Sequence, residues 1–139
     1  MSTEYFYFTG KAKWAKTKEP DKAFGSSEYK ITLYVDKKTK KDIIEAGVQV
    51  TPKEDDEGIY FQFRRPESKL WPNGDLTDFG PPDIYSEDGK TKFDGYIGNG
   101  SDVTVKVSVY DTRKGKGHRL EAIRIDTLVP YDGGPKEGF

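Results

Sequence analysis

Aromatic and cationic side chains recur together on segments that have the pattern of β-strands. Residues two or four apart share one face of a strand, and four segments place a tyrosine on the same outward face as a lysine or arginine. Unpaired nucleobases stack on aromatic rings and cations contact backbone phosphates, so this mixture favours binding of single-stranded nucleic acid. A duplex has no bare base faces and is read in its grooves instead. The combinations are Tyr7 with Lys11 and Lys13, Tyr34 with Lys30, Tyr60 with Arg64, and Tyr110 with Lys106.

Two clusters of cations would extend such a surface. Lys11–Lys18 holds four lysines around Trp14, and the turn Arg113–Lys116 holds three cations in four residues. Trp71 lies in a predicted loop, where it would be either a stacking platform or a lid over the fold. Strict alternation places Trp14 on the apolar face with Phe8, and so inside the fold unless the strand ends before it. Tyrosine and tryptophan on strands also often cover a core, and this alternative stays open for each residue.

Signals for catalysis are weak. His118 is the single histidine and the chain has no cysteine, so neither a nucleophilic triad nor a thiolate metal site is recognisable. The acidic run Glu54–Glu57 lacks the alternating spacing of a calcium loop and is interpreted as a solvated turn. The glycine-rich segments 98–101 and 115–117 lack phosphate-loop spacing. We therefore expect a non-catalytic protein without cofactor or metal.

The net charge conceals an uneven distribution. The 139 residues carry a formal charge of −1, which excludes an overtly basic nucleic-acid-binding tail but not a basic groove on a mixed surface. Residues 1–50 carry +3, residues 51–101 carry −5 and residues 102–139 carry +1. Pairing of the two end blocks in one sheet would place their cations on a common face. No run of 18 apolar residues and no signal peptide is visible, so no membrane association is expected.

Period-two hydrophobicity predicts five strands, and a capped segment predicts one helix. Asp36 is a suitable N-cap for a helix over 37–46, and Gly47 a suitable stop. The region 66–100 is rich in Gly and Pro and is predicted to contain a short hairpin around 84–94. These elements predict a mainly all-β fold: a five-stranded OB-type barrel over residues 1–131, with one short helix, long loops and a flexible tail over 132–139. The strands are predicted at 4–15, 29–36, 59–65, 101–112 and 119–129.

Several segments are similar to a known family. Phe93–Val103, which leads into a valine-alternating strand, resembles the phage single-stranded-DNA-binding proteins with an OB fold. The same is true of the closing Leu128–Tyr131, the opening Gly10–Trp14, and the Phe24–Gly25 turn before Glu28–Ile31. The resemblance covers most of residues 10–131.

The resemblance implies a protein of phage DNA replication, recombination and repair that acts in the cytoplasm of the infected host cell. It would coat transient single strands, remove hairpins, form a homodimer and recruit replication proteins such as a polymerase or helicase-primase through its tail. The tail keeps a terminal aromatic residue, Phe139, as the partner-binding candidate, but has only two acidic side chains where the family has a strongly acidic end. The predicted helix also follows the second strand, whereas OB barrels usually place it after the third.

Together these observations predict sequence-tolerant binding of single-stranded DNA. Rival hypotheses are a carbohydrate-binding or virion structural β-module, which would not need the lysine clusters, and a small enzyme, for which no acid/base set is visible. The predicted DNA-binding residues are Lys11, Lys13, Trp14, Tyr34, Tyr60, Arg64, Trp71, Lys106, Tyr110, Lys114, Lys116 and Arg124.

Overall fold

A computed structural model describes residues 3–21, 27–48, 50–93, 95, 97–112 and 115–129. Within these ranges the chain forms nine strands and one helix, and no helix is long and apolar enough to span a membrane. The elements are β1 (Thr3–Asp21), β2 (Glu28–Val35), α1 (Lys37–Glu45), β3 (Lys53–Asp55), β4 (Gly58–Pro66), β5 (Ser68–Leu70), β6 (Leu76–Asp78), β7 (Asp83–Tyr85), β8 (Ser101–Thr112) and β9 (Gly115–Thr127).

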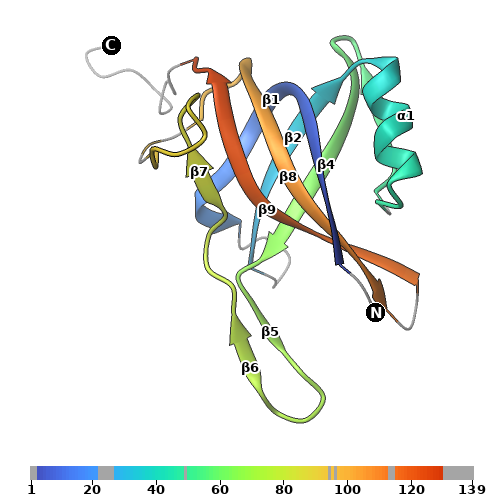
Figure 1. Ribbon diagram of the computed structural model, residues 1–139, viewed down its shortest axis with the longest axis vertical. Helices are drawn as coiled ribbons and strands as arrows, with labels where there is room; N and C mark the ends of the chain where they lie inside the picture. The colour runs from blue at the N-terminus through green and yellow to red at the C-terminus, as the bar shows by residue number, and fades with distance from the viewer. Residues whose placement is uncertain are drawn as a thin grey trace.

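The sheet confirms the mainly-β prediction but not the five-stranded barrel. Seven strands lie in the order β3-β4-β2-β1-β8-β9-β7, and the sheet is not closed by a hydrogen-bonded ladder among the described residues (Figure 1). The five long strands overlap the five predicted ones. The two edge strands, β3 and β7, have three residues each, too few to show alternation in the sequence. β5 and β6 form a separate hairpin that projects from the sheet.

The predicted helix and the predicted tight turn are both present. The side chain of Asp36 accepts a hydrogen bond from the Thr39 backbone N–H at 2.7 Å, and Gly47 follows the helix at φ +90°. Such a cap satisfies one of the unpaired N–H groups at the start of a helix. Tyr85 and Lys92 form an antiparallel bridge around the turn at Asp88, inside the region predicted as a hairpin.

The alternating apolar residues of the long strands form the core. Each contributes the face that the sequence pattern predicts, and Ile43 from α1 adds to them. Burial of these side chains is the main force that favours folding. The residues with no measurable exposure include Ile31, Leu33, Phe61, Phe63, Val103, Val105, Val107, Leu120 and Ile123.

A backbone irregularity in β1 reverses one part of this pattern. Trp14 has a positive φ of 49°, and the pairing of β1 with β2 shifts register between Lys13 and Lys16. An extra residue in one strand turns the following side chains to the opposite face. Ala12 is therefore buried and Trp14 is 52% exposed. The prediction that Trp14 lies on the apolar face is wrong for this reason.

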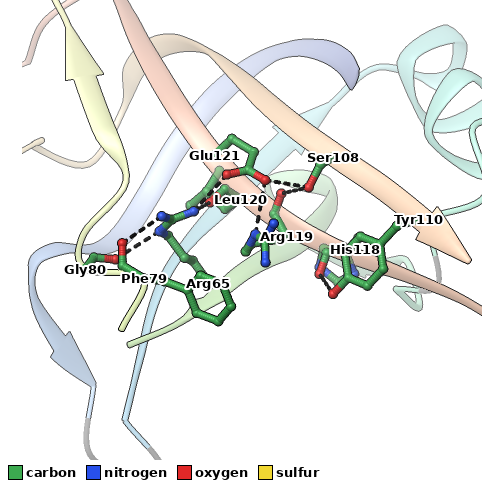
Figure 2. Close-up of polar contacts among 9 residues, drawn as sticks. All are labelled: Arg65, Phe79, Gly80, Ser108, Tyr110, His118, Arg119, Leu120 and Glu121. Atoms are coloured by element: carbon green, nitrogen blue, oxygen red, sulfur yellow. Dashed lines mark hydrogen bonds and ion pairs between the residues drawn. The ribbon is translucent and has the colours of Figure 1, made fainter. Parts of the chain in front are cut away.

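A side-chain network joins β4 to β9, the first and last of the five long strands in the sheet order, which share no ladder among the described residues. Arg65 of β4 donates to the Leu120 carbonyl at 3.2 Å and to Glu121 Oε1 at 2.8 Å, both on β9 (Figure 2). Its other nitrogens donate to the carbonyls of Phe79 and Gly80 at 2.8 and 2.9 Å. The guanidinium thus holds together two long strands and the base of the projecting hairpin.

The carboxylate of Glu121 completes the network from the β9 side. Its Oε2 accepts hydrogen bonds from Ser108 at 2.6 Å and from Arg119 at 3.1 Å (Figure 2). These donors hold the pKa of Glu121 below its usual value despite partial burial, which by itself would raise it. Glu121 is therefore ionised at neutral pH and pairs with two arginines.

We predict that Arg65→Ala destabilises the fold. The change leaves the carbonyls of Phe79, Gly80 and Leu120 without the Arg65 donor and removes one of the two arginines that pair with the partly buried Glu121 carboxylate. The free energy of unfolding should therefore fall by about 3 kcal/mol. The neighbouring Arg64→Ala is the matched control, since Arg64 is exposed. It should change the same quantity by less than about 0.5 kcal/mol. Urea unfolding followed by circular dichroism measures both variants, and equal losses would contradict the assigned role of Arg65.

Candidate nucleic-acid interface

The outward face of β4, β2 and β1 gathers side chains from three predicted aromatic–cation segments. The register pairs Tyr60 with Tyr34 and Arg64 with Lys30, and β1 continues the same face with Lys11 and Lys13. Tyr34 and Lys30 lie four residues apart on one strand, about 13 Å. Tyr34 and Tyr60 therefore make their contacts across neighbouring strands. The sequence pattern suggests instead that each tyrosine lies beside the cation on its own strand.

Three aromatic rings from three strands lie in contact on this face. The ring centroids of Trp14 and Tyr34 are 6.5 Å apart, and those of Tyr34 and Tyr60 are 5.1 Å apart. The ammonium of Lys13 lies 5.4 Å from the Trp14 ring and 5.3 Å from the Tyr34 ring. A cation at this distance is attracted to the ring faces. The β1 bulge thus brings Trp14 into an aromatic cluster instead of the core.

A cleft of about 470 Å³ opens beside this cluster. It combines ring surface from Trp14 and Tyr60 with the cations Lys53 and Arg64 and with polar side chains that can reach base edges. Its walls come from β1, β2, β3, β4, β9 and the segment before β3. The lining residues are Trp14, Thr32, Val50, Thr51, Lys53, Tyr60, Gln62, Arg64 and His118.

Tyr34 supports this cluster and does not present a free stacking surface. Its side chain is buried, with 8% exposure, and its hydroxyl donates to Asp55 Oδ2 at 2.5 Å. Burial, and after it the hydrogen bond to Asp55, raises the pKa of Tyr34 to about 12. The prediction that Tyr34 stacks bases directly is therefore corrected: the ring holds Trp14 and Tyr60 in place.

The acidic turn after β3 also belongs to this region, a placement that the strand pattern does not predict. Glu57 forms an ion pair with Lys13, and Asp55 holds Tyr34. The alternating strand pattern carries no information about a turn, and only the pairing of β3 with β4 brings these carboxylates to the cleft. Lys11 pairs similarly with Asp102 at 3.0 Å, on β8.

The remaining predicted residues lie elsewhere. Lys106 and Arg124 line a second hollow on β8 and β9, while Trp71 and Tyr110 share a third. Lys116 pairs with Asp111 at 2.7 Å and lines none of these three hollows. Lys114 and Phe139 lie outside the described residues, as does the predicted tail over 132–139.

His118 packs against the core. Its ring contacts Phe63 edge-on at 6.3 Å, and its Nε2 is buried without a hydrogen-bond partner. Burial, with a smaller contribution from the charge of Arg64, lowers the pKa of His118. In the part of the chain that the structure describes, no three His, Cys, Asp or Glu side chains are grouped to hold a metal ion.

The raised pKa of Tyr34 predicts an alkaline loss of stability. The unfolded chain releases a tyrosine proton near pH 10.0 and folded Tyr34 releases its proton only near pH 12. The contribution of Tyr34 is thus complete below pH 10.0 and is lost as the pH rises toward 12.

We expect Tyr34→Phe to reduce the dependence of the free energy of unfolding on pH over this range. The free energy of unfolding of Tyr34→Phe should fall less steeply over this range than that of the wild type. Asp55→Asn should give an intermediate slope, because it removes the carboxylate charge but keeps an acceptor. Denaturant melts at graded pH measure this, and identical slopes for wild type and Tyr34→Phe would refute the assignment.

Comparison with known proteins identifies the fold. No protein-family model matches the chain, and no curated protein matches it in sequence. Solved structures do match. The single-stranded-DNA-binding protein gp2.5 of bacteriophage T7 superposes over 100% of both chains with a TM-score of 0.68 and 17% identity.

A second phage protein gives similar values with and without DNA. The single-stranded-DNA-binding protein of bacteriophage Enc34 in complex with single-stranded DNA matches with a TM-score of 0.61 and 14% identity, covering 93% of this chain and 89% of that one. Without DNA it matches with a TM-score of 0.59 and 14% identity, covering 96% and 87%. The chain therefore has the fold of these phage single-stranded-DNA-binding proteins.

Proposed function

We propose that this protein binds single-stranded DNA without sequence preference through the outward face of β1, β2 and β4. The observation that carries the proposal is the cluster of Trp14, Tyr34 and Tyr60 with the Lys13 ammonium over its rings, beside an open cleft. Support comes from the fold shared with a phage protein solved in complex with single-stranded DNA. In OB-type folds, oligonucleotides usually bind the face formed by the second and third barrel strands. The second and third long strands of this chain are β2 and β4.

The chemistry of the cleft suits unpaired nucleotides. Bases would stack on Trp14 and Tyr60, where each stacked base contributes about 1–3 kcal/mol. Phosphates would contact Lys13 and Arg64, whose carboxylate partners are Glu57 and Glu28. Exposed ion pairs of this kind are weak, so phosphates can replace the carboxylates at low cost. A glycan would use the rings but would gain nothing from the cations.

The wider role follows from the same proposal. Such a protein would cover transient single strands during replication, recombination and repair of phage DNA in the cytoplasm of the host cell, without catalysing a reaction. The C-terminal segment with Phe139 would recruit replication proteins, and the binding unit would be a monomer or homodimer. The acidic side chains beside the cleft would limit binding to duplex DNA, because they offset the charge of the cations at the cleft.

A titration with single-stranded and duplex DNA tests the stacking part. Labelled oligo-dT should bind in fluorescence anisotropy, and duplex of equal length should bind at least about tenfold more weakly. Trp14→Ala and Tyr60→Ala should each weaken oligo-dT binding by about tenfold or more, which corresponds to one lost stacking contact. Trp14→Phe keeps an aromatic ring and should recover most of the affinity. Equal affinity for duplex, or an unaffected Trp14→Ala, would defeat the proposal.

Salt dependence tests the phosphate contacts separately. The logarithm of the binding constant should fall linearly with the logarithm of salt concentration, by about 0.7 for each phosphate contact. Lys13→Gln and Arg64→Gln should each reduce this slope by roughly that amount. Lys37→Gln, at the start of α1, removes the same charge away from the cleft and should leave the slope unchanged. If all three variants gave the same slope, Lys13 and Arg64 would not be phosphate contacts.

A further inference from the structure

A second aromatic surface lies on the outward face of β1, β8 and β9. Tyr5 and Tyr7 project from β1 with 55% and 64% exposure, which is unusual for large rings. The register places Tyr7 opposite Lys106 of β8, and the Lys106 ammonium lies 4.9 Å from the Tyr5 ring. The two tyrosine rings on β1 therefore form a row along this face, and the Lys106 ammonium of β8 lies beside it.

The row borders a hollow of about 480 Å³ that contains a pre-oriented arginine. Arg124 donates from Nε to Asp126 at 2.7 Å and from Nη2 to the Thr104 hydroxyl at 3.2 Å. Both contacts use one part of the guanidinium, and the side chain remains 47% exposed. An arginine held in this way keeps donors for a phosphate in a fixed orientation.

A third hollow continues the row at its far end. Tyr110 lies opposite Thr3, two residues along β1 from Tyr5, and lines a space of about 320 Å³ with Trp71. The Arg119 guanidinium lies 5.7 Å from the Tyr110 ring and is fixed by Glu121 within the network of Figure 2. On the other side, Lys69 lies 4.2 Å from the Trp71 ring. Both ends of the row thus combine rings with cations.

We propose that this face, defined by Tyr5, Tyr7, Lys106, Arg124, Tyr110 and Trp71, holds a second segment of single-stranded nucleic acid. The inference rests on the proposed function but concerns a different surface. The Lys11–Asp102 ion pair, which lines neither hollow, lies between the two faces.

The spacing of the rings favours a single strand over a duplex. Tyr5 and Tyr7 are two residues apart on a strand, about 7 Å. Bases in a duplex are about 3.4 Å apart along the strand. A nucleic acid that places one base on each ring must therefore be unstacked and extended, which a paired strand cannot be. Lys106 lies opposite Tyr7 with its ammonium 4.9 Å from the Tyr5 ring, where it would contact the phosphate that connects the two bases.

The two tryptophans provide separate reporters for the two faces. Trp14 belongs to the first cleft and Trp71 to the second face, and the chain has two tryptophans in all. Trp71→Phe therefore reports only on the first cleft, and Trp14→Phe only on the second face. Each variant is titrated with oligo-dT of about 8 and about 20 nucleotides, lengths within and above the range of one OB-type site.

We expect both tryptophans to be quenched, but under different conditions. If one strand runs over both faces, one equivalent of the long oligonucleotide quenches Trp71 fluorescence and the short oligonucleotide does not. If two strands bind, Trp71 responds to a second equivalent of the short oligonucleotide. Either result supports the proposal. Quenching of Trp14 without quenching of Trp71 would overturn the proposal of a second face and would still support binding at the first cleft. If neither tryptophan were quenched, the proposed function itself would be overturned.

A mutational ratio tests the same face without the reporters. In the wild type the long oligonucleotide should bind about tenfold or more tightly than the short one, after correction for the number of available registers. In the double variant Tyr5→Ala/Tyr7→Ala, and in Lys106→Gln, this ratio should fall toward one. Lys38→Gln on α1 is the charge-matched control and should keep the wild-type ratio. A ratio unaffected by the Tyr5 and Tyr7 changes would contradict the proposal.

Discussion

The Arg65 guanidinium makes the contacts on which the arrangement of the sheet depends. The sheet order leaves β4 and β9 without a shared ladder among the described residues, and Arg65 joins them through the Leu120 carbonyl and the Glu121 carboxylate. The same side chain holds the carbonyls of Phe79 and Gly80 at the base of the β5–β6 hairpin. Because a planar guanidinium presents donors in several directions, one residue can fix three parts of the chain.

The two proposed surfaces both depend on local geometry that this framework supports. On the first, the bulge at Trp14 turns an indole out of the core and onto the ring of Tyr34. On the second, the Glu121 carboxylate that Arg65 contacts also fixes Arg119 beside Tyr110. The tyrosine rings of both surfaces lie on strands, which hold a stacking surface more rigidly than a loop would.

Acids placed next to the cations of the two proposed surfaces offset part of their charge. Lys13, Arg64 and Arg124 each have a carboxylate partner, supplied by Glu57, Glu28 and Asp126. In the free protein these partners orient the cations and reduce attraction to any polyanion. A ligand that also stacks on the rings can displace them, whereas a duplex lacks accessible base faces and gains only the electrostatic contribution. In the proposed function, the mixed charge would therefore favour selectivity for unpaired strands.

Sequence alone determined the local structure, because a strand or capped helix follows from side chains a few residues apart. The alternating valines of 103–109, the Asp36 cap, and the outward position of Tyr60 and Arg64 were all readable in this way. The tertiary structure decided which strands are neighbours. It moved Trp14 outward, buried Tyr34 against Asp55, gave Lys106 to Tyr5 instead of Tyr110, and brought Trp71 beside Tyr110. These contacts join residues far apart in the chain, so no pattern within one segment could report them.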